Sequence, residues 1–354
     1  MKIAHISDTH IRNLKYHYEY KTAFADLYIK LKQMSPDIIV HTGDIAHTKT
    51  QLSPEFFQMC SSFLYNLAEI APTYIILGNH DGNLKNDTRQ DAITPIVEAL
   101  EHNNIHLLKN SGETKINEKI TFNVLSVFDR ENWVKPTDSE AINIALYHGS
   151  IHGCQTSQGY VIDEGEDSID IFNDFDFAML GDIHKQQRMD KEGRVRYAGS
   201  TVQQNFGESI NKGFLMWNIR DKDDWYCQGV SILNPRPFIT VDLTPQGKIP
   251  HTIIPKGCRL RIRSAANISP MMLKAACDYA QNKWRPYSVS FVNNGTMQSS
   301  TGSLIGKAVI NENLRDLTIQ EKYIRIYCKD LNLKAEVMDK ILELNKKYNQ
   351  VVEE

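Results

Sequence analysis

The stretch Lys2–His10, KIAHISDTH, places a short β-rich run directly before an Asp-x-His motif. The same plan recurs twice along the chain. The run Asp37–Thr42 precedes Gly43-Asp44, and the run Thr73–Leu77 precedes Gly78-Asn79-His80-Asp81. Ligand sites in α/β proteins gather outside the carboxyl ends of strands. The three motifs therefore predict a site at one edge of a sheet.

Two later runs end in the same kinds of side chain. Asn143–Tyr147 is followed by His148, and Asp176–Leu180 is followed by Gly181-Asp182-Ile183-His184. Lys119–Val127 is a further strand candidate. Five strand ends therefore carry potential metal ligands, and they can converge on one point.

Helical patterns alternate with these strands. Apolar residues recur at helical spacing in Thr22–Met34 and Pro54–Ile70, and Pro54 suits a first helical turn. Asp91–His102 is a third candidate helix. Strands that alternate with helices indicate a layered α/β domain.

Bulk composition limits the class of protein. The chain has 354 residues, which predicts one large domain with one or two small ones. Its 41% hydrophobic and 23% charged residues are typical of a soluble globular protein. The chain has no apolar run of membrane-spanning length, and Met1–Ile6 lacks the layout of a signal peptide, so we expect a cytoplasmic protein without membrane contact.

Charge and cysteine content narrow the expectations further. The net charge is -3, so any nucleic-acid contact must use a local basic patch or a partner. The 6 cysteines are scattered without a Cys-x-x-Cys pair, which favours buried thiols in a reducing compartment over zinc or disulfides. All but one of the 12 histidines lie at or before His184, which places the chemistry in the first half.

The sequence pattern changes near residue 232. Asn234–Pro237 resembles a linker, and a small α+β module follows. Its expected strands are Phe238–Leu243, Cys258–Ser264 and Ser288–Val292, and its expected helix is Pro270–Asn282. Asn293–Lys307 is polar and could be a flexible linker. Leu314–Tyr348 is predicted as two helices, the last with Leu333, Val337, Ile341, Leu344 and Tyr348 on one face. The predicted domains are 1–232, 233–296 and 297–354.

Each motif would supply a particular ligand or turn to a metal site. Asp8 and His10 would share a face if the strand continued through them. Gly43 would let the chain turn so that the Asp44 carboxylate could bridge two metals, and Asn79 offers an amide oxygen. Taken singly, Asp8 could be a turn cap, Asp44 a helix cap and His148 a core histidine. Together, each at a strand end, they predict a metal centre.

These motifs resemble the signature of the calcineurin-like metallophosphoesterases, which runs DxH, GDxx, GNHD, H and GHxH. Within that family the chain looks most like the Mre11/SbcD nuclease subunits. His47, three residues after Asp44, is one shared feature. The stretch Gly199–Glu208, GSTVQQNFGE, is similar to the GSxVQQxFGE stretch of those nucleases. The small module and helical tail match their layout of a capping domain and a partner-binding segment.

The resemblance implies a fold, cofactors and roles. The fold would be a four-layer α/β sandwich flanked by helices, with a small α+β capping domain and a helical C-terminal arm. Two Mn²⁺ ions are implied, with Mg²⁺ as an alternative. One ion would be held by Asp8, His10, Asp44 and His184, and the other by Asp44, Asn79, His148 and Asp182. His80 would stabilise charge on the phosphate or protonate the leaving oxygen, and His47 would help place a DNA phosphate.

Position 182 departs from the family pattern. Members usually have histidine there, whereas this chain has Asp182. An oxygen ligand suits Mn²⁺ or Mg²⁺. The added negative charge predicts tighter metal binding, a weaker Lewis acid and a shift toward harder ions.

Partner predictions complete the interpretation. DNA contact is predicted at basic residues in loops that leave the metal face, although each one alone could be an ordinary solvated side chain: Arg12, Lys15, Lys49, Lys185 and Arg188. The resemblance implies a homodimer that forms through the helices Pro54–Ile70 and Asp91–His102. The alternative is that these helices only pack in the core of their own chain. The tail would bind an SbcC/Rad50-like ATPase, or else pack on its own domain. We expect a nucleoid-associated protein, or one of the host cytoplasm if the chain is viral.

Three functions compete. The leading hypothesis is a Mn²⁺-dependent DNA exonuclease and endonuclease that acts at DNA ends in recombination, repair or replication. A phosphatase or cyclic-nucleotide phosphodiesterase would use the same metal set, but GSTVQQNFGE and the C-terminal module disfavour it. The third is a DNA-end-binding scaffold with a site weakened by Asp182.

Overall fold

The computed structural model describes residues 1–86, 89–266, 268–293, 321, 324–325 and 335–350. The predicted linker Asn293–Lys307 lies almost wholly outside these residues, as does most of the first predicted tail helix. Within the described ranges, no helix has both the length and the apolar character needed to cross a membrane.

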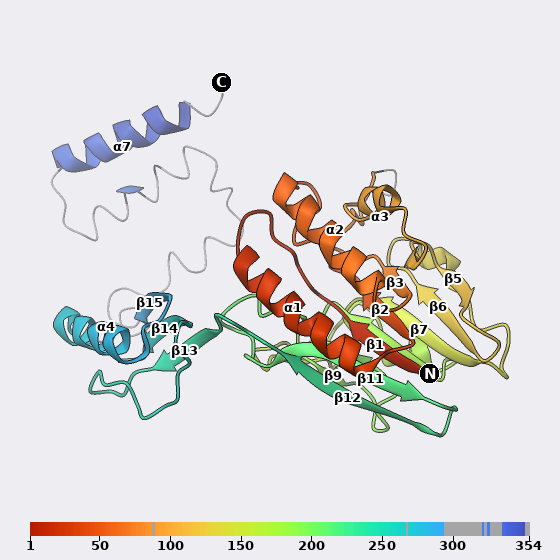
Figure 1. The fold of residues 1–354 in the computed structure, drawn as a ribbon. Coiled ribbons are helices and arrows are strands. Elements are labelled where there is room, and N and C mark those ends of the chain that lie inside the picture. The colour runs from red at the N-terminus through yellow and green to blue at the C-terminus, as the bar shows by residue number, and fades with distance from the viewer. Residues whose placement is uncertain (87–88, 267, 294–320, 322–323, 326–334, 351–354) are drawn as a thin grey trace.

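Two six-stranded sheets form the large part of the molecule (Figure 1). The first has the order β12-β11-β1-β2-β3-β4, with β1 to β4 parallel and the β11–β12 hairpin joined to β1 by antiparallel pairing. Its strands are β1 (Lys2–Ile6), β2 (Ile38–Thr42), β3 (Thr73–Ile76), β4 (Ile105–Leu107), β11 (Lys212–Ile219) and β12 (Trp225–Ile232).

The second sheet has the order β5-β6-β7-β8-β10-β9, with a parallel centre and an antiparallel strand at each edge. Its strands are β5 (Gly112–Lys115), β6 (Ile120–Leu125), β7 (Ile142–His148), β8 (Phe177–Gly181), β9 (Gln187–Arg188) and β10 (Val195–Tyr197). The central strands β6, β7 and β8 are buried along their whole length.

Alternation along β1 shows how the sheets stack. Ile3 points into the apolar core shared by the two sheets, beside Phe122 and Trp217. Ile6 points the other way, into a second core covered by helices. A third core on the outer face of the second sheet is closed by loops and by the short helices η1 (Arg130–Asn132) and η2 (Ile169–Phe172).

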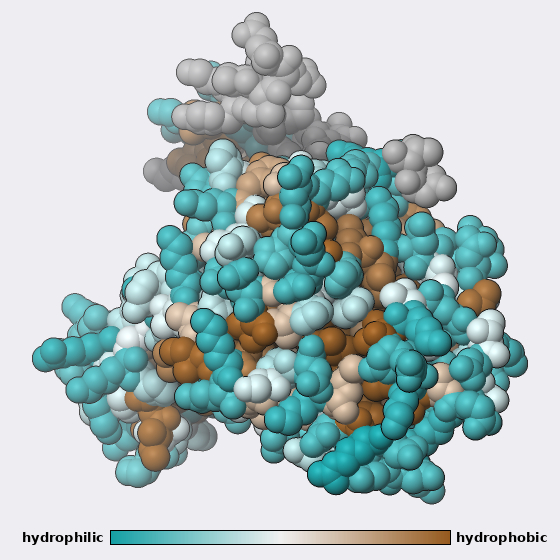
Figure 2. All heavy atoms as spheres, turned by 45° about the vertical axis from the view of Figure 1, so that its right-hand side comes forward, coloured by the Kyte–Doolittle hydropathy of each residue, from teal (hydrophilic) through white to brown (hydrophobic). Residues whose placement is uncertain are grey.

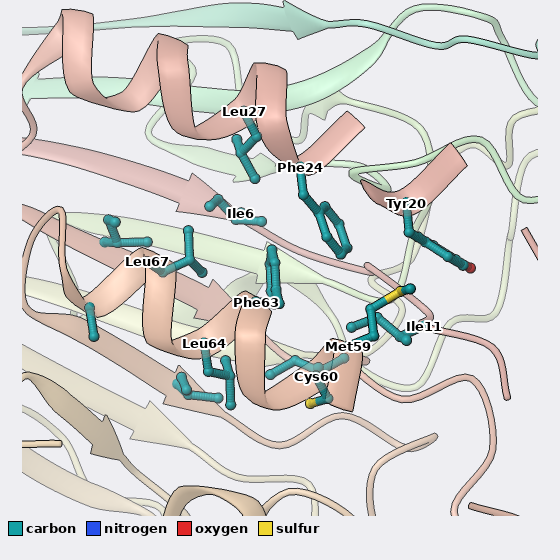
Figure 3. Packing of buried hydrophobic residues seen from close by; sticks show 14 of the residues in the cluster. Ile6, Ile11, Tyr20, Phe24, Leu27, Met59, Cys60, Phe63, Leu64 and Leu67 are labelled. Atoms are coloured by element: carbon teal, nitrogen blue, oxygen red, sulfur yellow. The ribbon is translucent and has the colours of Figure 1, made fainter. Parts of the chain in front are cut away.

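Three helices follow the strands of the first sheet: α1 (His17–Met34), α2 (Pro54–Ala68) and α3 (Thr94–Leu100). The Oγ of Ser53 accepts the N–H of Phe56 at 3.2 Å and caps α2, whose first residue is Pro54. Phe24 on α1 and Phe63 on α2 meet with ring centroids 4.5 Å apart, over Ile6 (Figure 3). The helices therefore cover the first sheet and leave its strand ends to the loops.

A small module follows the hairpin. Its sheet is wholly parallel, in the order β13-β14-β15, and α4 packs on one face over a separate apolar core. The elements are β13 (Phe238–Asp242), β14 (Arg259–Ser264), α4 (Pro270–Trp284) and β15 (Ser288–Asn293). Glu19 on α1 is buried between Arg259 and Arg236, so the module is tied to the first helix by ion pairs. The last described helix is α7 (Ala335–Gln350), close to the predicted one.

The predicted fold class is confirmed, with corrections at particular elements. Helix α1 begins at His17, five residues before its predicted start. The third predicted helix is shorter, because the Asp91 carboxylate accepts the N–H groups of Ile93 and Thr94 and holds the chain outside the helix. The β11–β12 hairpin was not predicted. Its outer strand has no strict alternation of buried and exposed residues.

The described cysteines agree with the prediction of thiols. Cys60, Cys154 and Cys258 are buried, Cys227 and Cys277 are partly buried, and all five are free. The sixth, at position 328, lies outside the described residues.

Candidate metal centre

The predicted ligands come from strand ends in both sheets. Loops after β1, β2 and β3 carry four of them, the last residue of β7 is His148, and the loop after β8 carries the other two. The full set is Asp8, His10, Asp44, Asn79, His148, Asp182 and His184. The structure brings all seven together where the parallel strands of the two sheets end.

The backbone at four of these ligands has a left-handed conformation. The φ angles are 50° at Asp8, 47° at His10, 58° at Asp44 and 91° at Asp182. The prediction that a continuing strand puts Asp8 and His10 on one face is therefore wrong in its reason, because β1 ends at Ile6. Strained backbone of this kind costs energy and clusters at functional sites.

Asp44 stands between two groups of ligands. Its Oδ2 lies 3.5 Å from His10 Nε2, and its Oδ1 lies 3.4 Å from His148 Nε2. The backbone N–H of His80 donates to the same Oδ1 at 2.8 Å. One carboxylate therefore presents an oxygen to each side, which is the geometry of a ligand that bridges two cations.

The first group surrounds His10. The Nε2 atoms of His10 and His184 are 2.9 Å apart, and each lies 3.9 Å from Asp8 Oδ1. Two ring nitrogens that face each other this closely, beside a carboxylate, can share one cation.

The second group surrounds His148. Asp182 Oδ1 lies 3.9 Å from His148 Nε2 and accepts a hydrogen bond from Asn79 Nδ2 at 3.3 Å. His148 Nδ1 pairs with Thr42 O at 2.7 Å, so Nε2 is the nitrogen left for a ligand. The structure therefore places Asp182, the residue that departs from the family pattern, beside Asn79 and His148.

Two glycines make this convergence possible. A Cβ on Gly78 would lie 2.2 Å from Asp44 Oδ1, and a Cβ on Gly181 would lie 2.1 Å from Thr42 O and 2.7 Å from His148 Nδ1. No larger residue fits at either position without moving a ligand. The glycines of the GNHD and GDIH motifs are therefore required by close approach rather than by loop flexibility alone.

Polar atoms and charge at the site fit a divalent cation. His148 Nε2 and Asn79 Oδ1 are buried without a hydrogen-bond partner in the described part of the protein. Burial raises the pKa of Asp8 to about 6 and also raises the pKa of Asp182. Burial raises the pKa of Asp44 as well, but neighbouring His148 and His10 outweigh it and hold that pKa well below its usual range. Bound cations would neutralise these carboxylates.

His47 and His80 lie beside the first group. The His80 ring centroid is 4.9 Å from that of His10, and the His47 ring stacks on His80 at 5.9 Å. His80 Nδ1 pairs with His47 O at 2.8 Å, so Nε2 is the ring nitrogen left for other contacts. His47 Nε2 accepts from Arg12 Nη1 at 2.8 Å, and burial together with Arg12 lowers the His47 pKa to about 4. His47 is therefore neutral, and Arg12 carries the positive charge.

The five predicted DNA-binding residues are placed unequally. Arg12 reaches His47, and Lys49 Nζ donates to Asn79 O at 3.0 Å, so both border the ligands. Lys185 donates to Gln155 Oε1 at 2.6 Å. Its neighbour His184 lines a cleft of about 430 Å³ together with Asp182. Lys15 and Arg188 are exposed, and no contact in the described part of the chain joins either to a ligand.

Sequence reasoning missed three residues of the site. Asp81 accepts the N–H groups of Asp44, Ala46 and Gly78 at 2.8, 2.8 and 3.0 Å and so ties two ligand loops together. Glu208 contacts His184, and Lys212 contacts Glu208. Asp81 and Glu208 are the last residues of the motifs GNHD and GSTVQQNFGE, and their place in these motifs could have identified them from the sequence. Lys212 gave none.

Comparisons with known proteins identify one family and two viral relatives. A family model described as calcineurin-like phosphoesterase matches residues 1–187. An uncharacterized protein of Acanthamoeba polyphaga mimivirus is 38% identical over 274 residues, which are 73% of this chain and 20% of that protein. A protein of Invertebrate iridescent virus 6 with a provisional phosphoesterase name is 28% identical over 200 residues, 53% of this chain and 66% of that protein. The chain thus covers less than two thirds of the length of either relative.

Proposed function

Because the chain belongs to the calcineurin-like phosphoesterase family, we propose that it is a two-metal phosphodiesterase that acts on DNA. Members of this family are dinuclear metal hydrolases. The observation that carries the proposal is the placement of Asp44, with one oxygen toward His10 and the other toward His148.

The chain's own residues define two cation positions. Asp8, His10, Asp44 and His184 would hold one cation, and Asp44, Asn79, His148 and Asp182 the other. When bound, two cations neutralise the phosphate and activate a water molecule. The second position has three oxygen ligands and one nitrogen, which favours Mn²⁺ or Mg²⁺.

Neighbouring side chains would handle the phosphate and the proton. His80 is exposed, and its Nδ1 hydrogen bond fixes the ring. In the doubly protonated ring, its Nε2 is therefore the atom that would donate to the phosphate or to the leaving oxygen. Arg12 would contact a phosphate oxygen, and His47 would hold the Arg12 guanidinium in place.

DNA as substrate rests on three features. GSTVQQNFGE and His47 resemble the Mre11/SbcD nucleases, and Arg12 and Lys49 put two cationic side chains beside the ligands.

The resemblance to the Mre11/SbcD nucleases also supports a capping domain and two kinds of partner. The capping domain would be residues 233–296, a homodimer would form through α2 and α3, and the C-terminal segment 297–354 would bind an SbcC/Rad50-like ATPase. Phe57 and Tyr65 on α2 are 39% and 45% exposed, and Val337 and Leu344 on α7 are 45% and 47% exposed, which leaves apolar area for both partners. Separate apolar patches among polar side chains are visible in Figure 2.

One assay separates the competing functions. Purified protein with Mn²⁺ is incubated with linear duplex DNA, with a cyclic nucleotide and with a small phosphomonoester. We expect DNA to be degraded, with activity lost in Asp44→Asn and kept in Asp242→Asn, a carboxylate of the small module paired with Arg263. Hydrolysis of only the small substrates would establish the phosphatase or cyclic-nucleotide alternative. DNA binding without any hydrolysis would establish the scaffold.

A further inference from the structure

The stretch Gly199–Glu208 entered the proposal above only through its sequence, and none of its residues was given a role at the site, yet it lies against the ligands. The N–H and the Oγ1 of Thr201 both donate to Ser7 O, at 3.1 and 2.8 Å. Gln204 Nε2 donates to Thr9 O at 3.3 Å. These contacts hold the backbone on both sides of Asp8. The last residue of the stretch, Glu208, contacts a predicted ligand directly.

Glu208 is surrounded by hydrogen-bond donors. Its side chain is only 3% exposed. One carboxylate oxygen faces His184 Nδ1 at 2.8 Å and Asn205 Nδ2 at 3.1 Å. The other faces Lys212 Nζ at 2.8 Å, with Ser200 Oγ and Gln204 N both at 3.1 Å. All of these partners can donate, so the position is built for an ionised carboxylate.

We propose that Glu208 is a positioning residue for the metal ligand His184. By accepting the proton of Nδ1, the carboxylate fixes the ring orientation and leaves the Nε2 lone pair directed at the cation position beside Asp8 and His10. Lys212 compensates the buried charge of Glu208, and its Nζ also donates to His184 O at 3.0 Å. The inference rests on the two-cation site of the proposed function.

The histidines of the two cation positions differ in the group that each one binds through Nδ1. His148 pairs through Nδ1 with a backbone carbonyl, Thr42 O, which carries no net charge. His184 pairs with a carboxylate, which makes the imidazole a stronger donor to a metal. Loss of Glu208 should therefore weaken one cation position selectively, whereas general loss of stability would affect both.

The test compares two matched double variants. Glu208→Gln with Lys212→Met removes the whole ion pair and leaves no unpaired buried charge. The control, Glu19→Gln with Arg259→Met, removes another buried glutamate with its cationic partner, at the contact with the small module. Mn²⁺ is titrated calorimetrically into each metal-free protein, and the exchange-coupled Mn²⁺ pair is followed by electron paramagnetic resonance.

We expect wild type and control to bind two Mn²⁺ and to give the coupled signal. In the Glu208 variant one dissociation constant should rise about 10–100-fold, with the coupled signal reduced and the other constant unchanged. The inference is overturned if this variant binds both ions as wild type does, or if the control loses the same site. Wild-type protein that binds fewer than two ions would instead overturn the proposed function itself.

Discussion

At the scale of single residues, the position of Asp44 is the feature on which the metal centre depends. Its carboxylate lies between His10 and His148. That position requires glycine at 78, because Asp44 Oδ1 lies where a Cβ on residue 78 would be. The sequence was sufficient to identify Asp44 and the other ligand candidates, because each belongs to a short local motif. It could not reveal the left-handed backbone at Asp8 and His10, which depends on contacts with residues far along the chain. Asp8 N, for example, donates to Gly43 O at 3.1 Å.

Asp182 gives the sharpest prediction at this scale. Asp182→Ala should lower the affinity for the second Mn²⁺, because it deletes an oxygen from the ligand group of Asn79 and His148. Loss of a residue that only contacts a ligand lowers metal affinity roughly 10–100-fold, and loss of a ligand should cost at least as much. Asp182→His should restore Mn²⁺ binding and lower the affinity for Mg²⁺ relative to Mn²⁺, because Mg²⁺ prefers oxygen ligands. Competitive titration with the two metals measures both effects. Unchanged two-metal occupancy in Asp182→Ala would rule out a ligand role.

At the scale of elements, strands and helices were predictable where apolar periodicity is strong. Helix α2 is the clearest case, since its predicted first residue, Pro54, is also its first residue in the structure. Periodicity failed where a side chain overrides it, as Asp91 does before α3. It also failed for β12, whose side chains do not alternate strictly between buried and exposed positions.

The two phenylalanines of α2 test the packing of that helix. Phe63 is fully buried against Phe24, whereas Phe57 is 39% exposed. Phe63→Ala should cost about 3–5 kcal/mol of unfolding free energy, because it leaves a cavity under the helix. The same truncation at Phe57 should cost much less. Urea unfolding of both variants measures the difference, and equal losses would mean that α2 does not pack as described.

Asp91 makes the stability of the α3 region dependent on pH. Burial tends to raise the Asp91 pKa, but Lys109 and the donors of Thr94 and Ile93 outweigh it and lower the pKa below its ordinary value. A lowered carboxyl pKa adds stability above the pKa of the unfolded chain, and that stability is lost as pH falls through the lower folded-state pKa. Asp91→Asn should therefore cost about 0.5–2 kcal/mol near neutral pH. The difference from wild type should shrink below about pH 4. A difference that stays constant with pH would contradict this account.

At the scale of the whole molecule, ligands from two sheets meet only because the sheets stack with their parallel strand ends together (Figure 1). Strand-end motifs could predict that convergence. They could not predict that the chain would return, after β10, to place Glu208 behind His184 and the β11–β12 hairpin beside β1. Nor could they separate Arg12 and Lys49, which border the site, from Lys15 and Arg188, which are exposed and have no described contact with a ligand.

DNA binding should distinguish these two pairs of basic residues. The double variant Arg12→Gln with Lys49→Gln should weaken binding to duplex DNA and lower the slope of log K against log salt by about 0.9 for each phosphate that it no longer neutralises. Lys15→Gln with Arg188→Gln removes the same charge at exposed positions and should change the slope little. Fluorescence anisotropy across a range of salt concentrations measures both slopes. Equal slopes for the two variants would show that proximity to the ligands does not determine the DNA path.

If the Asp44 carboxylate bridges two cation positions, the number of metal ions bound per chain depends on that one side chain. Metal-free wild-type protein and Asp44→Asn are each equilibrated with Mn²⁺, and the ions bound per chain are measured after removal of free metal. We predict two Mn²⁺ per wild-type chain and at most one in Asp44→Asn, because the amide cannot supply an anionic oxygen to both positions. Fewer than two ions in wild type, or two ions held with unchanged affinity by Asp44→Asn, would show that Asp44 does not bridge two cations.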